Sequence, residues 1–228
     1  MEPRRRQGWV LILAGVTCWF FIDGFTVART EILQLSEHVF EQAEAQHGGG
    51  AVARLKSWQQ ILASDTGKPD LEKLDVVNRF FNQLEFVDDI LHWGKKDYWA
   101  TPLEFLSTNG GDCEDFSVAK YFTLTALGLP ADKVYLTYVK SVSLDQAHMV
   151  VTYYPEPGAE PLVLDNLETD IRPASQRPDL LPVFSFNGDG LWLAKQRGKG
   201  KRVGEPTRLK RWRELLGRIQ IEKSSLGE

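Results

Sequence analysis

One cysteine of this chain stands in a setting that suits a nucleophile. Cys113 lies in the hexapeptide GGDCED at positions 110–115, directly before an apolar segment with the composition of a buried helix. A helix N-terminus and a neighbouring imidazolium lower the pKa of a thiol, whereas flanking carboxylates favour the protonated form. The hexapeptide therefore indicates a reactive cysteine whose acidic neighbours need neutralising. A buried, inert thiol is the alternative.

A cysteine hydrolase or acyltransferase also needs an imidazole and a polar group that orients it. Among the four histidines, His148 alone opens a predicted β-strand, and Asp165 closes the next one. With a turn centred between Glu156 and Pro157, His148 faces Asp165 directly, with Cβ atoms ~5 Å apart. The spacing predicts a triad of Cys113, His148 and Asp165. The alternative is a strand histidine with its own partner and an aspartate that caps a turn.

The elements that must position these residues predict an α+β fold. Four segments carry apolar residues at helical spacing: 31–40, 52–62, 71–91 and 114–127. Three β-rich runs follow: 134–140, 147–154 and 161–167. Because 114–127 is apolar on most sides, we expect a central helix that begins at the cysteine and packs on one face of an antiparallel sheet.

The C-terminal part continues this pattern. A further strand or hairpin is expected over 184–192, and a solvated, glycine-punctuated basic loop over 195–202. The last segment is predicted to be a helix that docks on the body of the protein through one apolar stripe. That stripe consists of Leu209, Trp212, Leu216 and Ile219.

Residues 1–28 predict an export signal. Three arginines at positions 4–6 precede an apolar run at 9–22, and small residues alternate up to Ala28. The run is shorter than the ~20 residues of a membrane-spanning helix, and an uncleaved anchor is the alternative. Cleavage near Ala28 leaves one domain, 29–228, whose single cysteine is Cys113.

The overall charge argues against one class of partner. The chain has a net charge of -4 and a pI near 5.7, whereas a generic nucleic-acid-binding domain is basic. Eleven of the 27 lysines and arginines nevertheless fall within 195–223. We therefore expect no nucleic-acid partner and assign no role to the basic C-terminal stretch.

Several short blocks resemble the signatures of one protein family. They are NRFFN at 78–82, DYWATP at 97–102, GDCEDF at 111–116, AHMV at 147–150 and PLVLDNL at 161–167. The family is that of the bacterial transglutaminase-like cysteine proteinases, which includes the LapG-type periplasmic proteases, and the resemblance extends over about 58–212. It implies a papain/transglutaminase-like fold with Cys113 as nucleophile, His148 as general base and Asp165 as the orienting group.

The resemblance also implies a calcium requirement, with Asp112 and Glu114 matching the family's ligands. Ca²⁺ takes six to eight oxygen ligands, and Asp112, Glu114 and Asp115 offer several from one turn. Capping of the helix N-terminus is the alternative role for these carboxylates. A second acidic pair, Asp88 and Asp89, is interpreted as a solvated helix end.

What the resemblance implies about biology is specific. Members of the family cleave the N-terminal region of a large surface adhesin, which releases cells from a biofilm, and an inner-membrane receptor that senses cyclic diguanylate inhibits the protease. The sequence thus predicts a calcium-dependent periplasmic cysteine endopeptidase. Two alternatives use the same residues: a transglutaminase or acyltransferase, in which an amine replaces water, and a non-catalytic module that binds the adhesin or the receptor.

Overall fold

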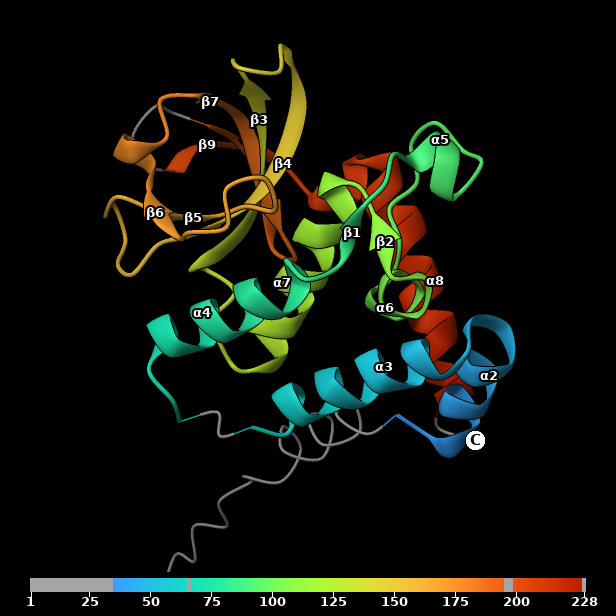
Figure 1. Cartoon of the computed structure of the whole chain (residues 1–228). Coiled ribbons are helices and arrows are strands. Elements are labelled where there is room, and N and C mark those ends of the chain that lie inside the picture. Colours follow the sequence, from blue (N-terminus) through green and yellow to red (C-terminus); the bar gives the residue numbers. More distant parts are fainter. Residues whose placement is uncertain (1–34, 65–66, 195–198, 227–228) are drawn as a thin grey trace, which may run out of the picture.

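The computed structural model describes residues 35–64, 67–194 and 199–226, so the predicted export signal lies outside the described residues. Helices and one large antiparallel sheet form two parts that meet at the helix that begins with Cys113 (Figure 1). The predicted α+β class is confirmed. Within the described ranges, no helix is both long and apolar enough to cross a bilayer.

Within the described residues, five helices precede the cysteine: α2 (Glu37–His47), α3 (Gly49–Leu62), α4 (Asp70–Phe81), α5 (Asp89–His92) and α6 (Pro102–Thr108). The predicted glycine break between the first two is Gly48 alone, whose φ of 78° a glycine adopts without strain. The helix expected over 71–91 ends at Phe81. The backbone beyond it pairs with residues 109–111 to form the short parallel strands β1 (Glu85–Phe86) and β2 (Gly110–Gly111).

The large sheet has seven antiparallel strands in the order β6-β5-β4-β3-β7-β8-β9. They are β3 (Val134–Ser141), β4 (Gln146–Tyr153), β5 (Leu162–Leu164), β6 (Arg172–Pro173), β7 (Leu180–Asn187), β8 (Gly190–Ala194) and β9 (Lys199–Gly204). The hairpin expected over 184–192 is confirmed. The loop expected over 195–202 is wrong in part, because β9 adds an edge strand there, while 195–198 lie outside the described residues.

The pairing of β4 with β5 differs from the expected register. Val151 lies opposite Leu164, so the pairing is shifted by two residues and His148 does not face Asp165 directly. The cause is the turn, which is centred on Pro157 and Gly158; Gly158 has φ of 82°, and Ala159 N–H donates to Glu156 O. Proline followed by a glycine with positive φ is typical of a type II turn. Because a shift by two preserves the side-chain faces, His148 and Asp165 still lie on the same face.

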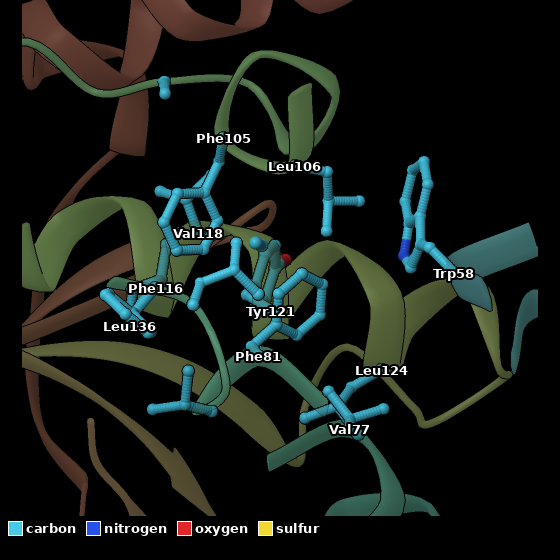
Figure 2. Packing of buried hydrophobic residues seen from close by; sticks show 14 of the residues in the cluster. Trp58, Val77, Phe81, Phe105, Leu106, Phe116, Val118, Tyr121, Leu124 and Leu136 are labelled. Atoms are coloured by element: carbon cyan, nitrogen blue, oxygen red, sulfur yellow. The ribbon is translucent and has the colours of Figure 1, made fainter. Parts of the chain in front are cut away.

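The helix α7 (Cys113–Ala126) lies in the middle of the core, as the sequence predicts. Its Phe116 packs edge-on against Phe105 of α6, with 4.8 Å between ring centroids, and Phe81 of α4 stacks on Phe105 at 6.2 Å. Figure 2 shows these rings gathered beside α7. Trp58 of α3 donates from Nε1 to Thr123 Oγ1 at 2.8 Å, which ties α3 to α7 as well.

The last helix, α8 (Lys210–Leu226), docks through its apolar stripe, as expected. Trp212 is buried and stacks on Phe122 of α7, with 5.5 Å between ring centroids. Further along α8, Arg218 donates to the carbonyl of Trp99, and the Glu222 carboxylate accepts from Thr101 Oγ1 at 2.6 Å. The helix therefore packs on α7 in the core and also hydrogen-bonds the segment that precedes α6.

Candidate active site

The hexapeptide around Cys113 forms a turn that starts α7. Asp112 is the N-cap and accepts from the backbone N–H of Glu114 at 3.2 Å, while Asp115 accepts from the backbone N–H of Asp112 at 3.3 Å. This is a capping box, in which two helical N–H groups are satisfied reciprocally. The capping role left open by the sequence is thus present for Asp112 and Asp115, and it fixes Cys113 at the first helical position.

Gly111 has a steric reason to be glycine. A Cβ atom at this position would collide with the carboxylate of Asp115, which folds back over the turn. Asp115 is fully buried and accepts from Ala100 N–H at 2.6 Å and from Trp93 Nε1 at 3.2 Å. The close approach of Gly111 therefore allows Asp115 to link the cysteine turn to residues 93–100.

The thiol of Cys113 donates to Glu114 Oε2, with 2.7 Å between Sγ and oxygen. Burial raises the pKa of Cys113, the charges of Glu114 and Asp112 raise it further, and the backbone N–H of Met149 lowers it. One turn later, Ser117 Oγ donates to the carbonyl of Met149 at 3.0 Å. The first turn of α7 is thus seated on β4 at the residue that follows His148.

His148 and Asp165 form a buried pair. Nε2 of His148 donates to Asp165 Oδ1 at 2.8 Å, and both side chains are at most 3% exposed. Burial raises the pKa of Asp165, but hydrogen bonds from His148, Leu167 N–H and Arg177 outweigh it and lower the pKa to about 2. The carboxylate is therefore ionised, and with Nε2 engaged, Nδ1 is the ring nitrogen left for proton transfer.

Of the three residues predicted as a triad, two are hydrogen-bonded to each other and the third is not bonded to either. His148 and Asp165 are joined directly, whereas the hydrogen bond of Cys113 goes to Glu114 and its turn rests against the residue next to His148. Catalytic hydrogen bonds are often long or misaligned before substrate binds. The arrangement brings a nucleophile and an oriented imidazole to the same end of α7.

Asp89 is a site residue that sequence reasoning missed. One carboxylate oxygen from each of Asp89, Asp112 and Asp115 lies within 4.8 Å of the others, and Glu114 approaches Asp112 and Cys113 in a second such group. Asp89 is 6% exposed, so its interpretation as a solvated helix end is wrong. The parallel pairing of β1 with β2 is the cause, because it brings the residues that follow each strand, Asp89 and Asp112, to the same end.

The acidic cluster has the chemistry of a site for a hard cation. Asp89 Oδ2 accepts from Tyr98 N–H at 2.5 Å, but Oδ1 is buried and has no hydrogen-bond partner among the described residues. Burial raises the pKa of Asp89, burial and the charge of Glu114 raise that of Asp112 to about 10, and burial raises that of Asp115 to about 8. Crowded, buried carboxylate oxygens fit calcium.

The members of the cluster differ in how free they are to bind an ion. Asp115 already accepts hydrogen bonds at both oxygens, and Glu114 accepts from Cys113 at one oxygen and from Tyr138 OH at the other, at 2.7 Å each. Asp89 has an oxygen without a partner in the described chain. Asp89 and Asp112 would therefore hold a calcium ion most directly, with Glu114 reoriented toward it.

Comparison with protein families agrees with this site. The family model described as bacterial transglutaminase-like cysteine proteinase matches residues 55–180, which is more than half of the chain and contains all the site residues above. The chain belongs to this family. The resemblance noted in the sequence is confirmed. As a member of this family, the chain is a thiol protease.

Solved structures of a related protein are similar to this proteinase. Three structures of Legionella pneumophila LapG are each 44% identical to it over 80% of its length. The matches include 96%, 96% and 98% of the residues of the three LapG chains, with TM-scores of 0.69, 0.71 and 0.68. The second of them was treated with EGTA, and the third is calcium-bound. Among curated proteins, no sequence matches significantly.

Proposed function

We propose that this proteinase is a calcium-dependent periplasmic endopeptidase in which Cys113, His148 and Asp165 carry the reaction. The observation that supports it most is the seating of the cysteine turn on β4 beside the buried His148–Asp165 pair. A nucleophile at a helix N-terminus next to an oriented imidazole is the arrangement that thiol catalysis needs.

The residues act in a defined order. His148 takes the proton of the Cys113 thiol, and Sγ then forms a bond to the scissile carbonyl carbon. The C–N bond breaks as His148 gives its proton to the leaving amine, which leaves a thioester. Water, deprotonated by His148, attacks the thioester carbonyl carbon. The C–S bond then breaks, the carboxylic acid product leaves, and His148 returns the proton to Sγ. Asp165 holds the imidazole throughout, because its carboxylate remains hydrogen-bonded to Nε2.

Asp89, Asp112 and Glu114 would hold the calcium ion, which supplies positive charge that offsets the carboxylates beside the thiol. Without that charge, burial and the negative charges of Glu114 and Asp112 oppose ionisation of the Cys113 thiol. The thiol also donates its proton in a hydrogen bond to Glu114. Asp115, by contrast, keeps the turn in place through its bonds to Ala100 and Trp93.

The substrate of this proposal is the N-terminal region of a large surface adhesin, whose cleavage releases the adhesin and promotes biofilm dispersal. An inner-membrane receptor that senses cyclic diguanylate inhibits the enzyme. Family membership and 44% identity to LapG over 80% of the chain support this assignment.

The test is cleavage of a purified adhesin N-terminal fragment by the chain 29–228, with and without EGTA, beside a Cys113→Ala variant. We expect one specific cut, lost with EGTA and lost in the variant. Cleavage that survives Cys113→Ala contradicts the thiol mechanism, and cleavage indifferent to EGTA contradicts the calcium role. A primary amine added to the reaction distinguishes transfer from hydrolysis, because a transglutaminase would give the amine adduct as its main product by mass spectrometry.

A further inference from the structure

Asp165 is held from both parts of the fold. Its backbone carbonyl accepts from Nδ2 of Asn82, the residue that caps the C-terminus of α4, at 2.9 Å and from the buried Lys120 Nζ of α7 at 3.0 Å. Its carboxylate lies on the sheet side, where Oδ1 accepts from His148 and from Leu167 N–H at 3.1 Å. The helical part thus fixes the main chain of Asp165, while the sheet part fixes its side chain.

The second carboxylate oxygen is taken by an arginine. Arg177 lies between β6 and β7, is 7% exposed, and donates from Nη2 to Asp165 Oδ2 at 2.8 Å. The same guanidinium donates to Asp179 from Nε at 3.0 Å and from Nη2 at 2.8 Å. His148 and Arg177 therefore divide the two oxygens of Asp165 between them.

We propose that Arg177 is a positioning residue of the triad, which acts by holding Asp165 so that Oδ1 stays on His148 Nε2. This inference rests on the proposed function for its catalytic consequence. The terminal torsion of an aspartate is broad and roughly two-fold, so an unrestrained carboxylate can turn and exchange its oxygens. A guanidinium on Oδ2 removes that freedom, and the imidazole is then held in one orientation.

Stability alone is a weak explanation for this arginine. A buried ion pair contributes little net stability, because removing two charges from water offsets most of their attraction. Arg177 also keeps a buried Nη1 with no hydrogen-bond partner among the described residues, and leaving a buried donor unpaired is unfavourable. The same hydrogen bond helps to lower the pKa of Asp165, against burial, which raises it. The carboxylate therefore stays ionised as well as oriented.

The experiment compares Arg177→Gln, Arg177→Lys and the control Arg172→Gln in the chain 29–228 with calcium. Arg172 is five residues away, is 40% exposed and pairs with Glu168 and Asp170 at the surface. Three quantities are measured: kcat and KM on the adhesin fragment, and the low-field proton resonance of His148 Nε2–H, which reports its hydrogen bond to Asp165.

For Arg177→Gln we expect kcat to fall about 10- to 100-fold, as is typical when a group that orients a functional residue is lost. KM should change by less than about twofold, since Arg177 does not contact substrate, and the resonance should shift or broaden. Arg177→Lys keeps the positive charge but loses the planar guanidinium, which donates to two carboxylates. Its kcat should therefore lie between those of wild type and Arg177→Gln, about threefold or more below wild type. The control should match wild type in all three quantities.

A folded Arg177→Gln chain with wild-type kcat overturns the proposal, as does a loss of kcat with an unchanged His148 resonance. If Arg177→Gln does not fold, Arg177→Lys decides in the same way, because its kcat is also expected to fall. Should the wild-type chain fail to cleave the adhesin fragment, the resonance still tests whether Arg177 holds the pair. Failure of the proposed function and failure of this inference are therefore distinguishable.

Discussion

The thiol of Cys113 donates a hydrogen bond to the carboxylate of Glu114, the next residue in the chain, with 2.7 Å between Sγ and Oε2. The other oxygen of Glu114 accepts from Tyr138 OH of β3, also at 2.7 Å. The glutamate is thereby held against the nucleophile from the sheet side. In this arrangement the thiol is protonated, so activation requires that Glu114 be drawn away or neutralised.

Glu114 should control how strongly the reactivity of Cys113 depends on calcium. In EGTA, we expect iodoacetamide to alkylate Cys113 about tenfold faster in Glu114→Gln than in wild type, because removing the adjacent charge lowers the pKa of the thiol. Mass spectrometry of the chain 29–228, whose single cysteine is Cys113, measures the rate. Glu156→Gln, in an exposed turn, is the control. Equal rates for both variants would contradict the inhibitory role of Glu114.

Asp89 should contribute to calcium affinity although it lies 23 positions before Asp112. Replacing it by Asn removes one charge from the ligand set, and we expect the dissociation constant for calcium to rise about tenfold or more. Isothermal titration calorimetry measures it. The matched control is Asp88→Asn, because Asp88 is the exposed neighbour. If Asp89→Asn binds calcium like the control, Asp89 is not a ligand.

Gly111→Ala should destabilise the site without touching the nucleophile. The added methyl collides with the Asp115 carboxylate, so either the turn or Asp115 must shift, at a cost of ~1–3 kcal/mol in the free energy of unfolding. Cleavage should fall as well, because the turn presents Cys113. Urea unfolding and the cleavage assay test this against Gly49→Ala, where a Cβ meets open space. A Gly111→Ala chain as stable and active as Gly49→Ala would refute the steric argument.

Lys120 should give stability a distinct pH dependence. Burial lowers its pKa from 10.5 to about 7, so between these values the unfolded chain binds a proton that the folded chain lacks, and stability rises with pH. In Lys120→Met this rise should be shallower by up to ~1.4 kcal/mol per pH unit.

Urea unfolding within that pH window measures the slope. Lys140→Met serves as the control, since Lys140 is 55% exposed and pairs with Asp145 at the surface. Parallel slopes for wild type and Lys120→Met would show that Lys120 keeps its proton on folding, contrary to this expectation.

The local part of the site could be predicted from the sequence. The central helix, its start at Cys113, the strand that carries His148 and the strand that ends just before Asp165 follow from periodicity and turn residues within short windows. The expected register of β4 and β5 differs from the observed one by two residues, because the register depends on which residues of the 156–159 turn take the central positions. His148 and Asp165 still form the predicted pair, since a shift by an even number of residues keeps side chains on the same face.

The rest of the site depends on tertiary contacts. Asp89 reaches the cluster through β1 and β2, which have two residues each and leave no periodic signal. Arg177 stands among turn-forming residues, and Lys120 lies between apolar residues in the middle of α7. Burial of a charged side chain is set by partners distant in sequence, here Asp165 in both cases, so single-sequence patterns do not reveal it.

The docking of α8 supports the site from a distant part of the sequence. Arg218 and Glu222 bond Trp99 and Thr101 across 119 and 121 positions of sequence, and the segment that they hold supplies the N–H group that Asp115 accepts. Each of these contacts closes a long loop, and closing it costs conformational entropy. The geometry of the cysteine turn therefore depends on the docking of α8, the last helix of the described residues. Displacement of α8 would remove this support, so the site is held by the C-terminal helix as well as by the residues around Cys113.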